Sequence, residues 1–429
     1  MRNALIRKLD SSPVYLRAFY WGKLLTITGG AQIIIQLVGL VSGILIIRIL
    51  PTSEYALYTL ANTMLGTMTI LADGGIATGV MSEGGKVWQD KFKLGVVLST
   101  GMDLRKKFAI GSLAIAVPIL FFLFRHHDVS LLMSFLLIIS LIPAFITALS
   151  GTILEVAPKL QQDIAPLQKI QLFSSIGRVM LLTVSVVIFP FAFLALIASS
   201  IPQIWSNVVM RKISLQYASK GQLPDPEVRK SILESVKRIL PLSIYYCFSS
   251  QITVFLLSIF GSTTSIAQIG ALGRLSMMLN IINVLFGVLI IPRFSRMPPD
   301  RKLLLKWYLI VHVFMVIFSA SLLSLVWLFP EQVLWILGKQ YSGLTEEVFL
   351  NFAACCLSLI AGIGFSLYSH RGWVMKTIPG ISIGLGGIIL GIFLFDFSTL
   401  KGILLFNLFV SAISVIVNFS HGVRKILQS

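Results

Sequence analysis

The sequence predicts an all-α polytopic membrane protein with twelve transmembrane helices. Of its 429 residues, 56% are hydrophobic and only 12% are charged, about half the charged fraction of a soluble globular protein. The mean hydropathy of +0.89 is far too high for a disordered chain. The hydrophobic residues are enough for roughly twelve bilayer crossings of about 20 residues each. This composition excludes an ordinary cytosolic enzyme.

Six apolar stretches of 18 residues or more come first in the chain. The first of them follows a basic N-terminal segment and is too long for the apolar core of a signal peptide, so we expect no cleaved leader. The fifth and sixth are divided only by Phe189-Pro190, where proline ends a helix. The six predicted spans are 24–49, 55–80, 107–124, 130–151, 168–189 and 191–210.

A polar connection, Arg211 to Arg238, separates these spans from six more. It contains Leu223-Pro-Asp-Pro-Glu and then a basic amphipathic helix with Ile232, Leu233, Val236 and Ile239 on one side, which predicts a linker on the membrane surface. The later predicted spans are 240–261, 265–292, 303–328, 345–368, 377–395 and 402–422. The predicted domains are an N-terminal six-helix bundle (1–218), a cytoplasmic amphipathic linker (219–239) and a C-terminal six-helix bundle (240–429).

A modest internal repeat relates the two halves. Thr52-Ser at the start of the second span and Thr264-Ser at the start of the eighth each follow a long apolar stretch and a tight turn. Six spans are an even number, so the two bundles would be parallel copies related by an axis along the membrane normal.

The chain is strongly basic, with 35 Lys and Arg against 17 Asp and Glu. In a soluble protein this balance would indicate nucleic acid as a partner, but here the basic residues lie between the apolar stretches, and no nucleic acid is expected. The side that carries both termini has 29 of them, and the opposite side has only Arg48, Arg125, Lys339 and Lys401. The positive-inside rule therefore predicts that both termini are cytoplasmic, with anionic membrane lipids as partners of the basic loops.

Motifs for catalysis or metal binding are lacking in the sequence. The three cysteines lie in apolar stretches without a CxxC spacing, and the pair His126-His127 has no cluster of further ligands around it. No phosphate-binding loop or nucleophile elbow occurs. The outer loops are too short to hold the catalytic groups of a membrane glycosyltransferase. We therefore expect no metal, no cofactor and no enzyme activity.

Three segments resemble a known family, and together they extend over most of the chain. They are Ile47-Arg-Ile-Leu-Pro-Thr-Ser-Glu-Tyr-Ala-Leu-Tyr, then Gly270-Ala-Leu-Gly-Arg-Leu through Ile291-Pro-Arg-Phe-Ser, and Trp335-Ile-Leu-Gly-Lys-Gln-Tyr. Their order and positions are similar to those of the polysaccharide transporter or O-antigen flippase family, within the multidrug/oligosaccharidyl-lipid/polysaccharide exporter superfamily.

The resemblance implies two six-helix bundles around a central cavity, which rock between inward-open and outward-open forms. It implies a flippase that carries an isoprenoid pyrophosphate-linked oligosaccharide from the inner to the outer leaflet of the bacterial inner membrane, in polysaccharide or O-antigen biosynthesis. Polysaccharide-assembly proteins are possible partners on this reading. The alternative is a drug or small-cation antiporter of the same superfamily. The charge of the cavity discriminates between them, since an anionic lipid needs buried arginines and a cationic drug needs buried carboxylates.

Two arginines lie at bilayer depth, one in each half. Arg178 and Arg274 are each about ten residues into a predicted span, so at about 1.5 Å per residue both lie near the midplane. An unpaired charge there costs roughly 2.5–3.5 kcal/mol, so such residues face a cavity or a partner. Because a guanidinium suits phosphate oxygens, we expect both to bind the pyrophosphate. The alternative is a structural role, with hydrogen bonds to helix carbonyls or polar side chains.

Asp73 and Arg48 are further candidates. Asp73 is the only acid deep within a predicted span, and it could couple proton movement to rocking; the alternative is a salt bridge with a basic inner loop or a cap at the Gly74-Gly75 break. Arg48 lies at the outer end of the first span, six residues before Glu54. It could contact substrate or a gate, or take a structural ion-pair or helix-end role.

Polar residues within the spans could bind the sugars. They could equally be interhelical hydrogen-bond partners worth about 0.6 kcal/mol each. In the resembled family the seventh span often carries an acid, and Gln251 stands in that region here, which argues against ion coupling through that helix. The candidates are Gln32, Gln36, Gln251, Asn280 and Asn283.

Overall fold

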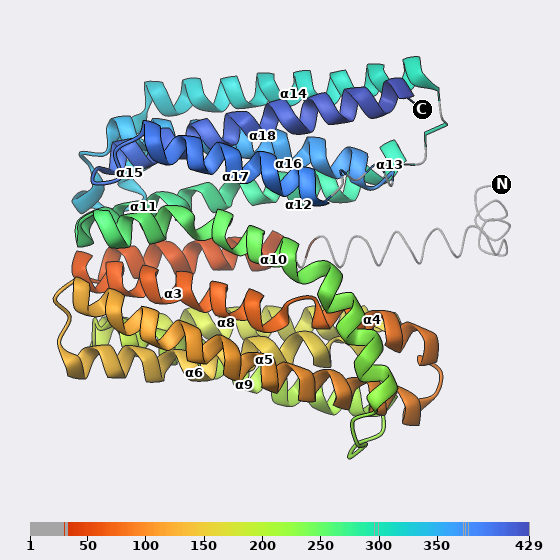
Figure 1. Ribbon diagram of the computed structural model, residues 1–429. Helices are drawn as coiled ribbons and strands as arrows, with labels where there is room; N and C mark the ends of the chain where they lie inside the picture. Colours follow the sequence, from red (N-terminus) through yellow and green to blue (C-terminus); the bar gives the residue numbers. More distant parts are fainter. Residues whose placement is uncertain are drawn as a thin grey trace, which may run out of the picture.

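A computed structural model describes residues 30, 33–295, 297, 298, 300–371, 373, 375 and 377–428, and every regular element among them is a helix (Figure 1). Within these residues nine helices are long and apolar enough to cross a membrane, and a bent helix pair makes a tenth. Two shorter apolar helices, Ile33–Ile49 and Ile378–Leu394, lie where the first and eleventh spans are predicted. The predicted all-α, twelve-span membrane fold is confirmed.

The first half runs from the helix Ile33–Ile49 to α9. Pro190 separates α8 from α9, as the sequence predicts. The helices after Ile33–Ile49 are α3 (Thr52–Asp73), α4 (Ile76–Val87), α5 (Lys91–His126), α6 (Leu131–Leu154), α7 (Val156–Leu160), α8 (Ile164–Ile188) and α9 (Ala192–Tyr217).

The second half runs from α10 to α18, and its eighth span is interrupted by a 3-10 turn between α11 and α12. The elements are α10 (Pro226–Phe260), α11 (Thr263–Ser276), η1 (Met277–Leu279), α12 (Asn280–Leu289), α13 (Ile291–Ser295), α14 (Arg301–Leu328), α15 (Pro330–Trp335), η2 (Lys339–Tyr341), α16 (Thr345–Ser369), α17 (Thr377–Leu394) and α18 (Leu400–Gln428).

The second predicted span, 55–80, is broken rather than straight. α3 ends and α4 begins on either side of Gly74 and Gly75, and the two helix axes differ by 41°. These glycines have φ angles of +47° and +97°, which residues with a Cβ rarely adopt. A Cβ on Gly75 would also lie 2.8 Å from the Cβ of Ile239 on α10. Glycine is therefore needed at the break for two reasons: the backbone conformation and the close approach of α10.

The segment before the seventh span and the span itself form one continuous helix, α10. The carboxylate of Asp225 caps its start by accepting hydrogen bonds from the backbone N–H groups of Glu227 and Val228. Ile232 and Val236 are buried in a cluster with residues of α4 and α5. This apolar side thus packs on protein, whereas the sequence predicts that it lies on the membrane surface. The prediction differs because an amphipathic pattern is the same for a helix that packs on protein and one that lies on lipid. The division of the chain into domains 1–218, 219–239 and 240–429 stays a prediction.

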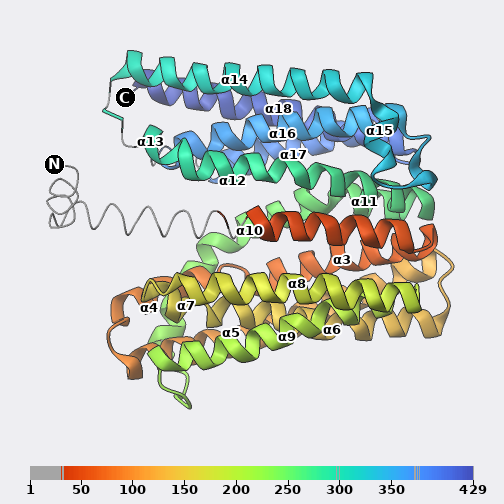
Figure 2. The same ribbon diagram turned by 180° about the vertical axis from the view of Figure 1, so that it is seen from behind.

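Figures 1 and 2 show two stacks of helices, α3 to α9 in one and α11 to α18 in the other, with α10 running between them. The helix Ile33–Ile49 lies between α3 and α11 in both views. α3 and α11 approach closely, since a Cβ on Gly270 would lie 2.5 Å from the hydroxyl oxygen of Thr59. The repeated Thr-Ser segments of the sequence therefore mark the starts of two helices that pack against each other.

The two ends of the molecule differ in charge. We call the end with Arg48 and Arg125 the Arg48 end, and the end with Lys91, Arg211 and Arg301 the basic end. At the Arg48 end, a buried apolar cluster joins the halves and includes Tyr55 of α3, Leu272 of α11 and Leu337 after α15. The hydrophobic contact between the halves is thus concentrated toward the Arg48 end.

Candidate functional site

Two glycines on the helix Ile33–Ile49 lie beside Arg178 and Arg274, and Gly43 leaves space that the Arg274 side chain occupies. A Cβ on Gly39 would lie 3.9 Å from Nη2 of Arg178, and a Cβ on Gly43 would lie 2.9 Å from Cδ of Arg274. Gly39 and Gly43 are four residues apart, which is about one helical turn, or about 6 Å along the axis. The first half and the second half therefore each send one arginine to the same side of this helix, at neighbouring turns.

Arg178 and Arg274 line one cavity of about 310 Å³. Its lining residues belong to the helix Ile33–Ile49, α3, α6, α8 and α9, except for Arg274 of α11. The cavity therefore lies within the first half, and Arg274 reaches it from the second. Most of its other polar groups are hydroxyls and amides, which can donate and accept hydrogen bonds. They are Ser42, Tyr58, Asn62, Thr147, Ser199, Ser200 and Gln203.

A second cavity of about 260 Å³ adjoins the first, and Arg178 and Gln203 line both. Its far side is formed by Glu155 and Gln171, which lie close to the basic end of α6 and α8. The Glu155 carboxylate is 2.7 Å from Lys159 Nζ and accepts a hydrogen bond from Gln171 at 3.1 Å. The acid of this second cavity is therefore already engaged by neighbours.

Neither arginine of the shared cavity has an acidic partner among the described residues. Both side chains are half-buried. Arg274 lies beside the hydroxyl groups of Tyr55 and Tyr58 and contacts the Met277 sulfur at 3.7 Å. The buried Nε of Arg178 has no hydrogen-bond partner in the described part of the chain. Two positive charges thus face one polar space with only neutral groups beside them.

Arg48 connects the two halves at the end that bears its name. Its guanidinium donates to the backbone carbonyls of Ile336, at 3.0 Å, and of Trp335, and lies 4.8 Å from the centre of the Trp335 ring. Gln340 adds a hydrogen bond to the carbonyl of Ile47 at 2.7 Å. Glu54 instead accepts a hydrogen bond from the backbone of Ala192. The structure shows a helix-end contact for Arg48, in place of an ion pair with Glu54.

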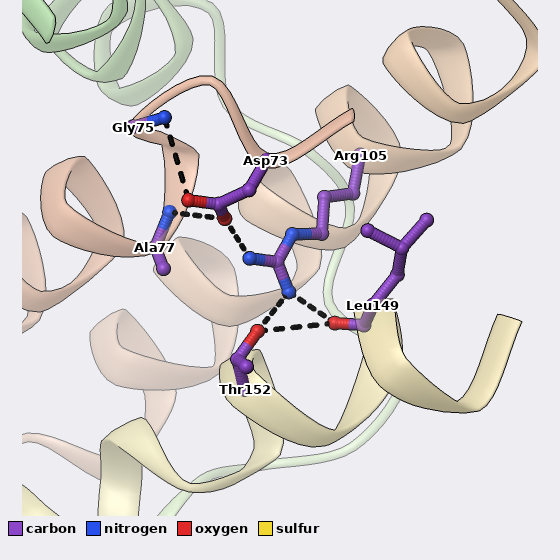
Figure 3. Close-up of polar contacts among 6 residues, drawn as sticks. All are labelled: Asp73, Gly75, Ala77, Arg105, Leu149 and Thr152. Atoms are coloured by element: carbon purple, nitrogen blue, oxygen red, sulfur yellow. Dashed lines mark hydrogen bonds and ion pairs between the residues drawn. The ribbon is translucent and has the colours of Figure 1, made fainter. Parts of the chain in front are cut away.

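Asp73 holds the break between α3 and α4 (Figure 3). Its carboxylate accepts hydrogen bonds from the backbone N–H groups of Gly75 and Ala77 and forms an ion pair with Arg105 of α5. Arg105 also donates to the carbonyl of Leu149 and the hydroxyl of Thr152 on α6. This is the geometry of the structural alternative, a salt bridge combined with a cap at the Gly-Gly break. Proton coupling through Asp73 stays a prediction.

The other predicted sugar-binding residues do not line the cavity that holds Arg178 and Arg274. Gln32 lies outside the described residues. Gln36 is half-buried on the helix Ile33–Ile49, and the Gln251 amide faces Gly66 of α3, whose Cβ position is 3.5 Å away. Asn280 is exposed at the start of α12, as is Asn283 one turn later. Among the described residues, no group of three His, Cys, Asp or Glu side chains could hold a metal ion.

Several residues of the cavity were not among the sequence candidates. Gly39 and Gly43 carry a signal that could have found them, since small residues four apart in a membrane helix indicate close approach. Ser199, Ser200 and Gln203 are polar residues on one side of α9, within an otherwise apolar stretch. Such a polar stripe is the feature expected of a helix that faces water or a substrate.

Comparison with known proteins shows similarity in structure alone. No protein-family profile matches the sequence, and no curated protein matches it. A solved structure described as MATE in complex with MaD3S superposes with a TM-score of 0.61 at 15% identity, covering 94% of each chain. MATE in the straight conformation gives 0.59 at 15% identity and 95% of each chain. An outward-facing multidrug resistance MATE family transporter of the MOP superfamily gives 0.56 at 13% identity, over 94% of this chain and 95% of that one.

This chain has the MATE transporter fold. The MATE fold and the apolar helices support a multi-pass membrane protein. At these identities the likeness shows the fold, and the O-antigen flippase family is not shown. The cargo has to be argued from the chemistry of the cavity.

Proposed function

We propose that this chain is an alternating-access transporter of an amphipathic anion, and that its cargo is an isoprenoid pyrophosphate-linked oligosaccharide. The observation that carries the proposal is the pair Arg178 and Arg274, which share one polar cavity without a described acidic partner. Desolvated positive charge costs free energy unless an anion compensates it. A pyrophosphate offers two adjacent phosphates that planar guanidinium groups can bind through paired hydrogen bonds.

The rest of the cavity supports a sugar as the second part of the cargo. Hydroxyl and amide groups such as Asn62, Ser199 and Gln203 supply the donors and acceptors that carbohydrate hydroxyls need. The two adjoining cavities have volumes of about 310 and 260 Å³, and binding pockets commonly measure roughly 300–1,000 Å³. The pair of cavities is therefore large enough for a head group, while an isoprenoid tail would stay in the bilayer.

The arrangement of contacts supports loading from the basic end. Arg48 and Gln340 join the halves at the Arg48 end, and the second cavity leads from Arg178 toward Glu155 at the other end. The excess of Lys and Arg in the loops of the basic end favours a cytoplasmic position for it. On this proposal the protein lies in the bacterial inner membrane, receives its cargo from cytoplasmic assembly enzymes and releases it in the outer leaflet.

A drug or small-cation antiporter is the second candidate function. The likeness to MATE structures favours it, since one of those proteins is described as a multidrug resistance transporter. A cationic drug requires carboxylates in the cavity. The acid found there, Glu155, is engaged by Lys159 and Gln171 in the second cavity, and the first cavity contains two arginines. The charge of the site therefore supports the anionic cargo over the cationic one.

Reconstituted protein can distinguish the two candidates. Proteoliposomes would be tested for translocation of a fluorescent isoprenoid pyrophosphate disaccharide and, separately, for uptake of ethidium, a lipophilic cation. We expect translocation of the pyrophosphate lipid, an about 100-fold lower rate for Arg274→Ala, and partial activity for Arg274→Lys. An interaction of about 3 kcal/mol between a buried charge and its partner corresponds to this factor.

Arg424→Ala is the matched control, because Arg424 is an exposed arginine of α18 outside the cavity. It should leave translocation unchanged. Ethidium transport with no movement of the pyrophosphate lipid would refute the anionic cargo and establish the antiporter reading. Wild-type translocation by Arg274→Ala, Arg178→Ala and the double variant would remove both arginines from the binding site.

A further inference from the structure

A groove on the outside of the first half adjoins the two cavities, since Thr147 lines both the groove and the first cavity, and Asn207 lines both the groove and the second. It has a volume of about 570 Å³ and lies between α5, α6 and α9, with the loop after α9 closing it at the basic end. That closure is tight, because a Cβ on Gly95 would lie 2.4 Å from the carbonyl oxygen of Ser219. Ser99 donates a hydrogen bond to the carbonyl of Gln222 at 2.6 Å and holds the same loop. The loop after α9 is therefore held firmly against α5 and closes the groove at the basic end.

Three exposed basic side chains line the groove, from its closed end inward. They are Lys106 on α5, Arg211 on α9 and Lys220 in the loop that follows α9. No ion pair with an acid is found for any of the three within the described residues. The nearby Asp103 is engaged by Lys107 and Arg229 instead. Three positive charges are thus available to a ligand that carries negative charge.

The remaining walls of the groove are apolar and face outward. Ile146 of α6 and Ile204 and Val208 of α9 line it, and each is 43–57% exposed although its helix crosses the membrane. Val208 and Ile204 precede Arg211 by three and seven residues, so this part of the apolar wall extends from about 5 to about 10 Å from Arg211 along the helix axis. The groove thus has positive charge toward the membrane surface and an apolar wall toward the bilayer centre. This arrangement matches a phospholipid, which has a charged head group and apolar acyl chains.

We propose that this groove is a binding site for an anionic phospholipid of the inner leaflet, with its phosphate at Lys106, Arg211 and Lys220 and an acyl chain along Ile146, Ile204 and Val208. Basic pockets between transmembrane helices on the cytoplasmic side recognise anionic head groups in this way. Arg105, which pairs with Asp73, also lines the groove. The bound lipid would therefore lie next to the ion pair that fixes the α3–α4 break. This proposal does not rest on the cargo of the cavity that holds Arg178 and Arg274.

The test is lipid binding by the full chain in detergent, measured by native mass spectrometry during titration with phosphatidylglycerol or phosphatidylcholine. We expect the wild-type chain to retain phosphatidylglycerol preferentially. The variant Lys106→Gln/Arg211→Gln/Lys220→Gln should bind it about 100-fold more weakly, since each basic residue near an anionic lipid contributes about 1 kcal/mol. Arg301→Gln/Lys302→Gln/Lys306→Gln removes the same number and kinds of charge from exposed positions on α14 and should bind as the wild type does.

A second variant keeps all the charges and blocks the acyl-chain wall. Val208→Trp places a bulky ring in the groove at an exposed position, so folding should be unaffected and phosphatidylglycerol retention should fall at least tenfold. The proposal is overturned if Val208→Trp binds phosphatidylglycerol as the wild type does, if the α14 control loses as much binding as the groove variant, or if the wild-type chain retains phosphatidylcholine equally well.

Discussion

Replacing Arg48 by Ala should loosen the contact between the halves at the Arg48 end. The guanidinium makes two hydrogen bonds to carbonyls of the other half and lies over the Trp335 ring. Because Arg48 is exposed, we assign about 0.5–1 kcal/mol to each hydrogen bond and about 0.5 kcal/mol to the cation–π contact. The sum of about 2 kcal/mol corresponds to an about 30-fold change in the ratio of open to closed forms. An open form populated at about 1% would rise to about 20%.

Distances between spin labels across this end would measure the change. Pro190→Cys, in the loop between α8 and α9, and Gly343→Cys, before α16, are exposed positions in opposite halves, and Gly343 has open space around its Cβ position. Cys247, Cys355 and Cys356 would first be replaced. Arg125→Ala is the matched control, because Arg125 donates to Val129 within its own half. A distance distribution for Arg48→Ala that matches both wild type and Arg125→Ala would refute the reasoning.

Three other predictions concern stability and coupling. Gly75→Val should lower the free energy of unfolding by about 2–4 kcal/mol, because the positive φ of Gly75 and the contact with Ile239 both oppose a side chain. Gly111→Ala is the control: its Cβ would meet open space, so the variant should be neutral or slightly stabilising. Thermal unfolding in detergent measures both. Arg105→Ala should lower the free energy of unfolding by about 3–5 kcal/mol, because it leaves the Asp73 carboxylate without its ion-pair partner. The double variant with Asp73→Asn should recover part of this loss. Equal melting temperatures for the single and double variants would contradict the reasoning. Arg178→Ala and Arg274→Ala should have strongly non-additive effects on translocation if both contact one ligand, and additive losses would show that they bind separately.

Helix content and order could be predicted from the sequence because the bilayer fixes both length and hydrophobicity of a span. Counting residues along two apolar stretches predicts that Arg178 and Arg274 lie near mid-depth. Their meeting at one helix could not be predicted in this way, since it depends on Gly39 and Gly43 on a third helix and on how two bundles pack. A sequence pattern gives depth along a helix but not its rotation relative to distant neighbours.

Contacts between segments far apart in the chain were also missed. Arg48 reaches carbonyls almost three hundred residues later, and backbone carbonyls leave no mark in a sequence. The sequence left a substrate or gate contact, an ion pair and a helix-end role open for Arg48. Tertiary packing places Arg48 on backbone carbonyls of the other half and Glu54 on the backbone of Ala192. The apolar side of α10 was visible as a pattern, but Ile232 met α4 and α5 where a membrane surface was expected.

The continuity of α10 has a mechanical consequence. Its first part packs on α4 and α5 of the first half, and its later part lies against α3 of that half and beside α11, α17 and α18 of the other. Pro241 lies between these parts, next to Leu240, which approaches Gly74. Proline has no N–H to donate, so the backbone ladder of the helix is already interrupted there. A tilt of one half against the other moves the later part of α10 against α3 or against α11, α17 and α18. Pro241 is the position where the helix can bend without losing a backbone hydrogen bond.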